Sequence, residues 1–207
     1  MSQFFQIHPE NPQARLIKQA VEIIRSGGVI VYPTDSCYAM GCHIGDKKAA
    51  ERIRSIRRLD PNHDFSLMCR DLTEIGVYAK LDNPAFRLLK SLTPGPYTFI
   101  LQATKEVPKR LLTPKRKTLG IRIANNNIVS DLLAALGEPL ISTTLHLPGD
   151  EFPLMDPYDI RDTLSSQVDL VIDGGYCGID TTTVVDMLDD VPKVLRAGLG
   201  DTTVFEE

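Results

Sequence analysis

Apolar residues in this chain alternate between short continuous runs and runs with helical spacing. Val29-Ile30-Val31-Tyr32 has the length and β-branching of a buried strand. Pro33 ends this strand because proline cannot donate to a β-ladder. Before the strand, apolar residues from Leu16 to Ile24 recur with the period of a helix and stop at Gly27-Gly28. The pair Asn11-Pro12 predicts the start of that helix.

The same alternation continues along the chain. Strands are predicted at 65–69, 97–102, 118–123, 140–145 and 168–172, with a closing hairpin at 182–187 and 193–196. Helices are predicted to begin at Asp46 and Asn83 and to span 71–79, 127–137 and 156–167. Strands that alternate with helices predict one α/β domain over residues 1–207, with an open, twisted, mixed sheet and flanking helices.

Composition narrows the class of protein. Hydrophobic residues make up 43% of the chain and the mean hydropathy is −0.09. No apolar run approaches the roughly 18 residues of a membrane helix, so we expect no membrane span. The first ten residues lack the basic-then-apolar form of a signal peptide, and we expect a cytoplasmic protein.

The four cysteines lie at positions 37, 42, 69 and 177, and none belongs to a CxxC pair. His43 and His146 are the nearest candidates for further metal ligands. The spacing fits no common zinc signature, so it favours buried, reduced thiols over a metal site.

Charge is divided unevenly along the sequence. Residues 1–149 contain 20 Lys/Arg and 13 Asp/Glu, whereas residues 150–207 contain 3 Lys/Arg and 14 Asp/Glu. This division predicts a cationic working face and an acidic segment. Two solvated surfaces of opposite sign explain it equally well.

A first candidate site follows the strand 29–32. Thr34, Asp35, Ser36 and Tyr38 place hydroxyl groups and a carboxylate at a strand exit, where open α/β sheets bind ligands. Such a set suits a small zwitterion. The alternative is an ordinary turn in which Asp35 accepts hydrogen bonds from backbone amides.

Two basic segments are candidates for phosphate binding. Six Lys or Arg residues lie between Lys47 and Arg58, and Arg57 lies near Ile53 at the inner edge of the predicted helix. Followed by His63, this segment suits a polyphosphate or a nucleic-acid backbone. The segment 105–117 is also basic but has no interleaved aromatic residues, which favours phosphate contacts over base stacking. A solvated helix face and a soluble loop are the alternatives.

Two further strand ends carry hydroxyl groups. The segment Ser142–Thr144 is followed by His146, which suits a phosphate donor or an acid–base group. The segment Thr181–Thr183, with Arg196 on the next strand, suits an anion clamp. A structural histidine and the β-propensity of threonine are the alternatives.

Several of these stretches, taken in order, resemble the YrdC/YciO family from about Leu16 to Gly198. VYPTDSCYAMG at 31–41 is similar to the family pattern PT(E/D)xxYGLG, and TPGPYT at 93–98 is similar to WPGPLT. IRI at 121–123 is similar to the RxP strand, with Ala124 in place of the proline. TTTVVD at 181–186 is similar to PSTVVD, and RAG at 196–198 to RxG. HDFSLMCRD at 63–71 resembles the YciO branch.

The resemblance implies a YrdC/RibB-like sheet with a basic concave face that binds double-stranded RNA or tRNA and nucleotides. In synthase members, ATP, L-threonine and bicarbonate form threonylcarbamoyl-adenylate for tRNA threonylcarbamoyladenosine modification, with Mg²⁺ accompanying ATP as substrate. A related domain of hydrogenase-maturation carbamoyltransferases makes a carbamoyl-adenylate. No tightly bound cofactor or resident metal is expected.

The resemblance also implies roles for particular residues. The amino acid or acyl group would contact Thr34, Asp35 and Tyr38. The nucleotide would contact Arg57, Arg58, Arg122, Thr144, Thr182 and Arg196. Catalytic roles would fall to Arg57, Thr144 and His146.

Two departures from the family pattern weigh against full synthase activity. Leu59 stands where synthases have the arginine of a KxR motif, and Thr144-Leu145-His146 replaces SxN. Loss of one electrostatic donor at an active site costs about a hundredfold in rate. The leading hypothesis is therefore binding of RNA and nucleotide, with synthase activity as the alternative. An adaptor that docks a basic partner on residues 150–207 is a third hypothesis.

Overall fold

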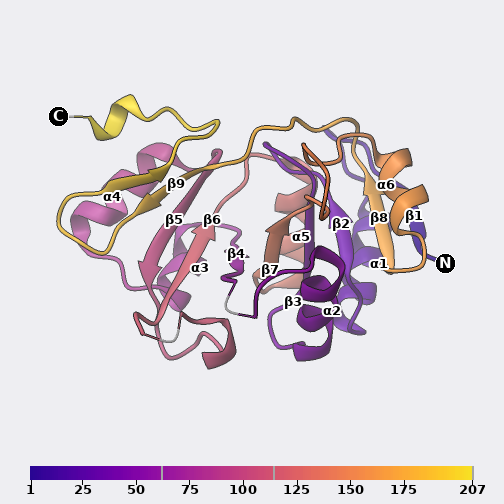
Figure 1. Cartoon of the computed structure of the whole chain (residues 1–207), viewed down its shortest axis with the longest axis horizontal. Coiled ribbons are helices and arrows are strands. Elements are labelled where there is room, and N and C mark those ends of the chain that lie inside the picture. The colour runs from indigo at the N-terminus through magenta and orange to yellow at the C-terminus, as the bar shows by residue number, and fades with distance from the viewer. Residues whose placement is uncertain (62, 114, 207) are drawn as a thin grey trace.

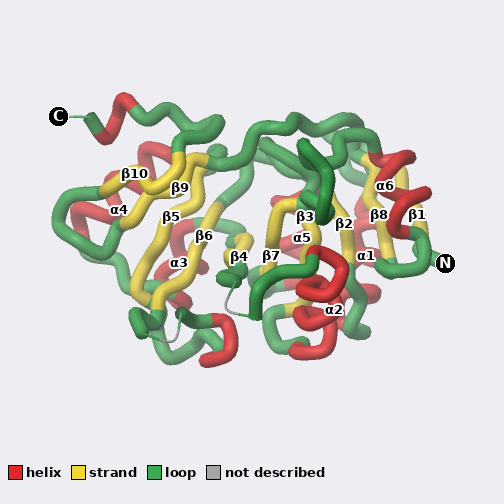
Figure 2. The backbone as a smooth tube through the Cα atoms, viewed as in Figure 1, coloured by secondary structure: helices red, strands yellow, loops and turns green. Residues whose placement is uncertain are grey.

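A ten-stranded mixed sheet runs through the computed structural model, which describes residues 1–61, 63–113 and 115–206 (Figures 1 and 2). The strand order is β1-β8-β2-β3-β7-β4-β6-β5-β9-β10. The strands are β1 (Gln3–Gln6), β2 (Ile30–Tyr32), β3 (Ala39–His43), β4 (Ser66–Met68), β5 (Tyr97–Gln102), β6 (Thr118–Arg122), β7 (Leu140–Thr144), β8 (Leu170–Asp173), β9 (Thr183–Asp186) and β10 (Lys193–Arg196).

Six α-helices flank the sheet in the described residues. They are α1 (Ala14–Arg25), α2 (Lys47–Arg57), α3 (Leu72–Tyr78), α4 (Asn83–Leu92), α5 (Asn127–Leu136) and α6 (Pro157–Leu164). Short 3₁₀ turns occur at Lys109–Leu111 and Thr203–Phe205. The pairs β1–β8, β2–β8, β4–β6 and β5–β9 are parallel and the remaining pairs are antiparallel. The predicted α/β class with an open mixed sheet is confirmed.

Two clusters of buried side chains hold the helices against the sheet. One contains Ile24 of α1 and Leu132 of α5 together with Tyr32 of β2. The other contains residues of α2, α3, α4 and α6 together with Phe99 of β5, one of the largest fully buried side chains. Because side chains alternate across a strand, the two clusters lie on opposite faces of the sheet.

Side-chain caps explain where most of the helices begin. Asp46, Asp71, Asp82, Asn126 and Asp156 each accept a hydrogen bond from a backbone amide in the first turn of the following helix. The predicted starts at Asp46 and Asn83 are therefore confirmed, because Asp46 caps α2 and α4 begins at Asn83, directly after its cap Asp82.

The start predicted for α1 is wrong. The His8 ring nitrogen Nδ1 accepts hydrogen bonds from the amides of Glu10 and Asn11, which holds Asn11 in a turn outside the helix. The helix instead begins at Ala14, after Gln13.

The strand that follows the polar segment after β2 was not predicted from the sequence. Ala39–His43 forms β3, which pairs antiparallel with β2 and β7. Gly41 lies inside this strand, where an added Cβ would come within 2.8 Å of the Tyr32 ring. The glycine is therefore required by close packing, and the loop is confined to residues 33–38.

Within the described residues, no helix is long and apolar enough to span a membrane.

Candidate functional site

A cavity of about 290 Å³ opens on one face of the central strands. Its walls come from β4, β5, β6, β7 and β9, from the loop before β3, and from single side chains of α2 and β10. In Figure 1 these strands lie in the middle and left of the view, with β4 between β6 and β7. Segments far apart in the sequence therefore meet at one place.

Strand periodicity makes this face polar. In β5, Phe99 and Leu101 belong to the core, whereas Thr98 and Ile100 line the cavity. Gly120 of β6 forms part of the same surface, and an added Cβ there would lie 2.9 Å from Ser66 Oγ and 3.0 Å from Thr98 Cγ2. A side chain at position 120 would therefore crowd the cavity wall.

Arg57, the last residue of α2, also lines the cavity. Its Nε donates to the carbonyl oxygen of His146 at 2.7 Å and its Nη1 donates to Thr143 Oγ1 at 2.8 Å. Among the described residues Arg57 forms no ion pair. Burial lowers the pKa of Arg57 from its ordinary value, but an arginine stays charged at neutral pH. The cavity therefore contains a guanidinium group without a counter-ion from the described chain.

A second guanidinium lies at the mouth of the cavity. Arg196 donates through Nη2 to the carbonyl oxygen of Thr182 at 2.9 Å. The Thr182 hydroxyl is also hydrogen-bonded to the Thr98 hydroxyl at 2.8 Å. The predicted combination of threonine hydroxyls with Arg196 is thus present on the cavity wall.

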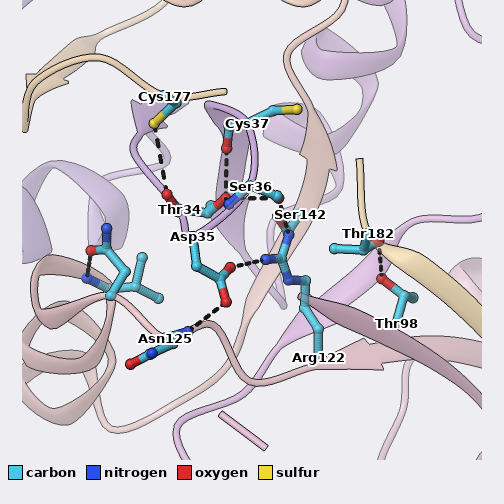
Figure 3. Close-up of polar contacts among 12 residues, drawn as sticks. Thr34, Asp35, Ser36, Cys37, Thr98, Arg122, Asn125, Ser142, Cys177 and Thr182 are labelled. Carbon is cyan, nitrogen blue, oxygen red and sulfur yellow. Dashed lines mark hydrogen bonds and ion pairs between the residues drawn. The ribbon is translucent and has the colours of Figure 1, made fainter. Parts of the chain in front are cut away.

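A third guanidinium, that of Arg122, is buried in an ion pair (Figure 3). Arg122 Nη2 donates to Asp35 Oδ1, and Asp35 Oδ2 accepts from the Asn125 amide at 2.9 Å. The side chains of Arg122 and Asp35 are only 8% and 11% exposed. Arg122 Nε is buried without a hydrogen-bond partner in the described residues, so one donor in the cavity wall is unsatisfied.

The loop 33–38 is held by its own polar groups. The Thr34 hydroxyl donates to the carbonyl oxygen of Cys37 at 2.6 Å and accepts from the Ser36 amide at 3.0 Å. Tyr38 is fully buried, donates to the Gly175 carbonyl and accepts from the Gly174 amide. Burial raises the pKa of this phenol, so it remains protonated.

His63 contributes no positive charge at the cavity wall. Burial, followed by the nearby Arg57 and Arg54, lowers the pKa of His63 below its ordinary value, which keeps the ring neutral at pH 7. Asp64 is the one carboxylate among the described residues that line the cavity, and burial raises its pKa. Arginines therefore supply the positive charge.

The structure brings most of the predicted residues together. Tyr38, Arg57, Arg122, Thr144, His146, Thr182 and Arg196 all line the cavity. Thr34 and Asp35 lie behind it, where Asp35 serves as the counter-ion of Arg122 rather than facing the cavity. Arg58 is exposed, ends α2 in a left-handed conformation with φ of 48°, and does not line the cavity.

The two departures from the family pattern have structural consequences. Leu59 is half-buried and packs against the core, so it leaves no charged group at that position. The His146 ring is hydrogen-bonded through Nε2 to the carbonyl oxygen of Asp150 at 2.8 Å. The Thr144 hydroxyl has no hydrogen-bond partner among the described residues and is available to a ligand.

Sequence reasoning missed the strand residues that form the cavity floor. Ser66 and Thr98 lie within stretches that resemble the family but were given no role, Gly120 belongs to no such stretch, and each residue sits between apolar neighbours in a strand. The available signal was the alternation of small or polar residues with large apolar residues in β4, β5 and β6. That alternation places small or polar side chains of these strands on one face, where they line the cavity.

No group of three or more His, Cys, Asp or Glu residues suited to a metal ion occurs in the described part of the chain. The four cysteines are unpaired, and three of them are buried. Burial raises the pKa of Cys37, which lines the cavity, to about 11. This thiol is therefore poorly suited to act as a nucleophile at neutral pH.

Residues 22–198 match the Sua5/YciO/YrdC family model, which carries the description "Telomere recombination". The chain belongs to this family. YciO of Escherichia coli (strain K12) is 62% identical over 205 residues, which cover 99% of this chain and 100% of YciO. The crystal structure of E. coli YciO matches with a TM-score of 0.95. The YrdC/YciO resemblance is confirmed.

More distant members of the family carry functional names. The threonylcarbamoyl-AMP synthase of Nitrosococcus oceani is 31% identical over 159 residues, covering 76% of this chain and 85% of the synthase. The structure of P. abyssi Sua5 complexed with L-threonine matches with a TM-score of 0.86 at 23% identity. It covers 94% of this chain and 57% of that longer chain, and it shows a shared fold.

The buried Arg122–Asp35 pair yields a prediction for stability. Replacing one partner leaves the other charge buried and uncompensated, so Asp35→Leu should lower the free energy of unfolding by about 3 kcal/mol. Adding Arg122→Met should restore most of that loss, because the double variant buries no charge. Urea unfolding followed by circular dichroism measures both. Equal stability of Asp35→Leu and the parent, or additive losses in the double variant, would contradict the assignment.

Proposed function

We propose that the cavity binds a nucleoside triphosphate, of the ATP type, through its phosphate groups. The observation that carries this proposal is the meeting of Arg57, Arg122 and Arg196 around a wall of hydroxyl groups. Guanidinium groups pair with phosphate oxygens through charge-assisted hydrogen bonds. Asp35 neutralises one of the three, which leaves Arg57 and Arg196 as cations for the ligand.

The two arginines that form no ion pair among the described residues each have a donor nitrogen without a hydrogen-bond partner there. Arg57 uses Nε and Nη1 within the protein, and its Nη2 has no hydrogen-bond partner among the described residues. Arg196 likewise uses Nε and Nη2, which leaves its Nη1 without such a partner. Both side chains are thus held in place by the protein while part of each guanidinium remains available. Positioning of this kind favours binding because little side-chain freedom is lost on association.

The dimensions of the cavity favour a ligand larger than inorganic phosphate. A water molecule takes a share of about 30 Å³ in the liquid, so the cavity volume corresponds to roughly ten waters. Hydroxyl groups of Thr98, Thr144 and Thr182 add neutral donors and acceptors beside the cations. A phosphate chain with part of a nucleoside would use both kinds of group.

Arg57 supplies the direct test of nucleotide binding. A charged hydrogen bond is worth about 1.5–3 kcal/mol, so Arg57→Gln should weaken Mg-ATP binding by roughly ten- to a hundredfold. Calorimetric titration at low salt measures the affinity, and thermal unfolding confirms that the variant is folded.

Arg58→Gln is the matched control, because it removes the same charge from the adjacent residue outside the cavity. Its affinity for Mg-ATP should remain within about twofold of the parent. Equal weakening by both variants would show a general charge effect and would contradict the proposed site.

RNA is the proposed macromolecular partner, and it would lie over the basic segments 47–58 and 105–117. Arg110 Nη2 donates to the carbonyl oxygen of Ile44 at 2.8 Å, which joins the segment 105–117 to the loop before α2. Exposed cations flank this junction at Lys47, Lys48, Lys105, Lys109, Lys115, Arg116 and Lys117. The described part of the segment has no aromatic side chain, so phosphate contacts would dominate.

Salt dependence tests this partner. Double-stranded RNA should bind in low salt, with a logarithmic affinity that falls linearly as the logarithm of the salt concentration rises. The pair Lys115→Gln and Arg116→Gln should reduce the slope by about two, one for each lost phosphate contact. The pair Arg15→Gln and Lys18→Gln on α1 removes equal charge elsewhere and should leave the slope unchanged. Filter binding over a salt series distinguishes the two pairs.

Threonylcarbamoyl-adenylate synthesis is the second candidate function. It is favoured by the 31% identical relative that carries the name threonylcarbamoyl-AMP synthase. Two features at the positions of the family motifs weigh against it. Leu59 is apolar and packs against the core, and the His146 ring is engaged in a hydrogen bond within the protein. Asp35, engaged by Arg122 and Asn125, is also not free to act alone on a substrate ammonium group.

Pyrophosphate release tests the synthase reaction. Synthesis would release pyrophosphate only when ATP, L-threonine and bicarbonate are all present, and Arg57→Gln would abolish the release. No release above the level without threonine, under conditions in which the N. oceani synthase turns over, would remove this candidate while leaving nucleotide binding intact.

A further inference from the structure

A second cavity, of about 620 Å³, lies where β4 and β6 end. Its walls come from residues 69–73 after β4, from residues 123–133 after β6, and from α4 with the two residues that follow it. None of the described residues lines both this cavity and the one that contains Arg57. It is a separate space, whose wall begins one residue after Arg122.

The topology of the sheet creates this space. β4 and β6 are parallel neighbours, with Met68 paired to Arg122. Leu67 of β4 shares a buried cluster with Ile75 of α3, whereas Met68 shares the other cluster with Leu133 of α5. Adjacent residues of a strand point to opposite faces, so the helices that follow β4 and β6 cover opposite faces of the sheet. Open α/β sheets bind ligands at this kind of switch point, outside the carboxyl ends of the strands.

The inner wall of the cavity is apolar. Ile123, Ala124 and Leu133 are buried residues that line it, and Phe86 of α4 lines it with 41% of its surface exposed. The volume lies within the roughly 300–1,000 Å³ of small-molecule sites, which are also mostly apolar with a few polar groups. A ligand with an apolar ring or chain fits this wall.

Two cations lie among the lining residues. Lys90 is exposed one turn after Phe86 on α4 and forms no ion pair within the described residues. Arg70 donates through Nε to Asp71 at 2.9 Å, which leaves its two terminal nitrogens without a hydrogen-bond partner in that part of the chain. The rim therefore has a net positive charge. An aromatic ring and an ammonium group one helical turn apart can contact the apolar and charged parts of one ligand.

We propose that this second cavity binds a small amphipathic anion. Its acidic group would pair with Lys90 and Arg70, and its apolar body would lie against Phe86, Ile123 and Leu133. The proposal does not depend on nucleotide binding in the first cavity, because the two share no lining residue.

A fluorescent anion with an apolar body, 1-anilinonaphthalene-8-sulfonate, is a suitable probe. The native protein should bind it at one saturable site, and amide shifts in NMR spectra should concentrate at residues 123–133. The anion 1-naphthoate should displace the probe, whereas the neutral 1-naphthalenemethanol should displace it at least about tenfold more weakly. Equal displacement by the neutral compound would overturn the anionic assignment, and shifts centred elsewhere would overturn the location.

Variants separate this cavity from the rest of the surface. Ser130 is an exposed lining residue of α5, so Ser130→Phe should fill the cavity and weaken probe binding by about tenfold or more. Ala135→Phe adds the same ring to an exposed position of the same helix outside the cavity and should leave binding unchanged. Lys90→Gln should weaken binding about threefold, as expected for an exposed ion pair. Unchanged binding of the probe to Ser130→Phe would overturn the proposal, whether or not Arg57→Gln weakens Mg-ATP binding.

Discussion

Arg122 and Asp35 join the end of β6 to the loop between β2 and β3, and both charges are nearly buried. The same carboxylate accepts the Asn125 amide, so the exit of β6 toward α5 is fixed by the same contact. Removing either charge would leave the other buried without a counter-ion in a medium of low dielectric constant. This contact sets the wall of the first cavity on one side and the start of the second cavity on the other. The local arrangement of both candidate sites therefore depends on one buried ion pair.

The charge of the first cavity follows from how its arginines are held. Arg122 is neutralised within the protein, whereas Arg57 and Arg196 are hydrogen-bonded to neutral oxygens. A guanidinium held by carbonyl and hydroxyl oxygens keeps its full charge and a fixed direction. The surrounding strand face adds small and hydroxyl-bearing side chains, which leave room for a ligand while satisfying part of its polar surface. The proposed phosphate ligand would use all of these features.

Much of the fold could be predicted from the sequence because its signals are local. Apolar periodicity located α1, α5, β2 and β5, and the Asp46 cap fixed the start of α2. Errors arose where a contact outside the local sequence pattern determines the backbone structure. The His8 ring holds Asn11 outside α1, and the strand β3, which was not predicted, requires a glycine at position 41 because the Tyr32 ring packs against it. Neither contact has a signature in the local pattern of residues.

The candidate site was predictable only in part, for the same reason. Motif residues such as Arg57 and Arg196 could be named from the sequence, and both line the cavity. Asp35 could not be told from a ligand-binding carboxylate, because its engagement by Arg122 depends on where two distant strands end. Arg57 and Arg58 differ only in the direction set by the end of α2, where Arg58 takes a left-handed conformation. The second cavity could not be inferred from the sequence, since it arises from the order of the strands.

The central claim is that Arg57 and Arg196 bind phosphate groups on the polar face of the sheet. The most direct measurement is the crystal structure of this protein with a non-hydrolysable ATP analogue. The account predicts phosphate oxygens within hydrogen-bond distance of Arg57 and Arg196, beside Thr144 and away from Arg58. The account would be contradicted by well-ordered phosphates on the outer surface of α2, or in the second cavity at the ends of β4 and β6, with the first cavity filled only by water.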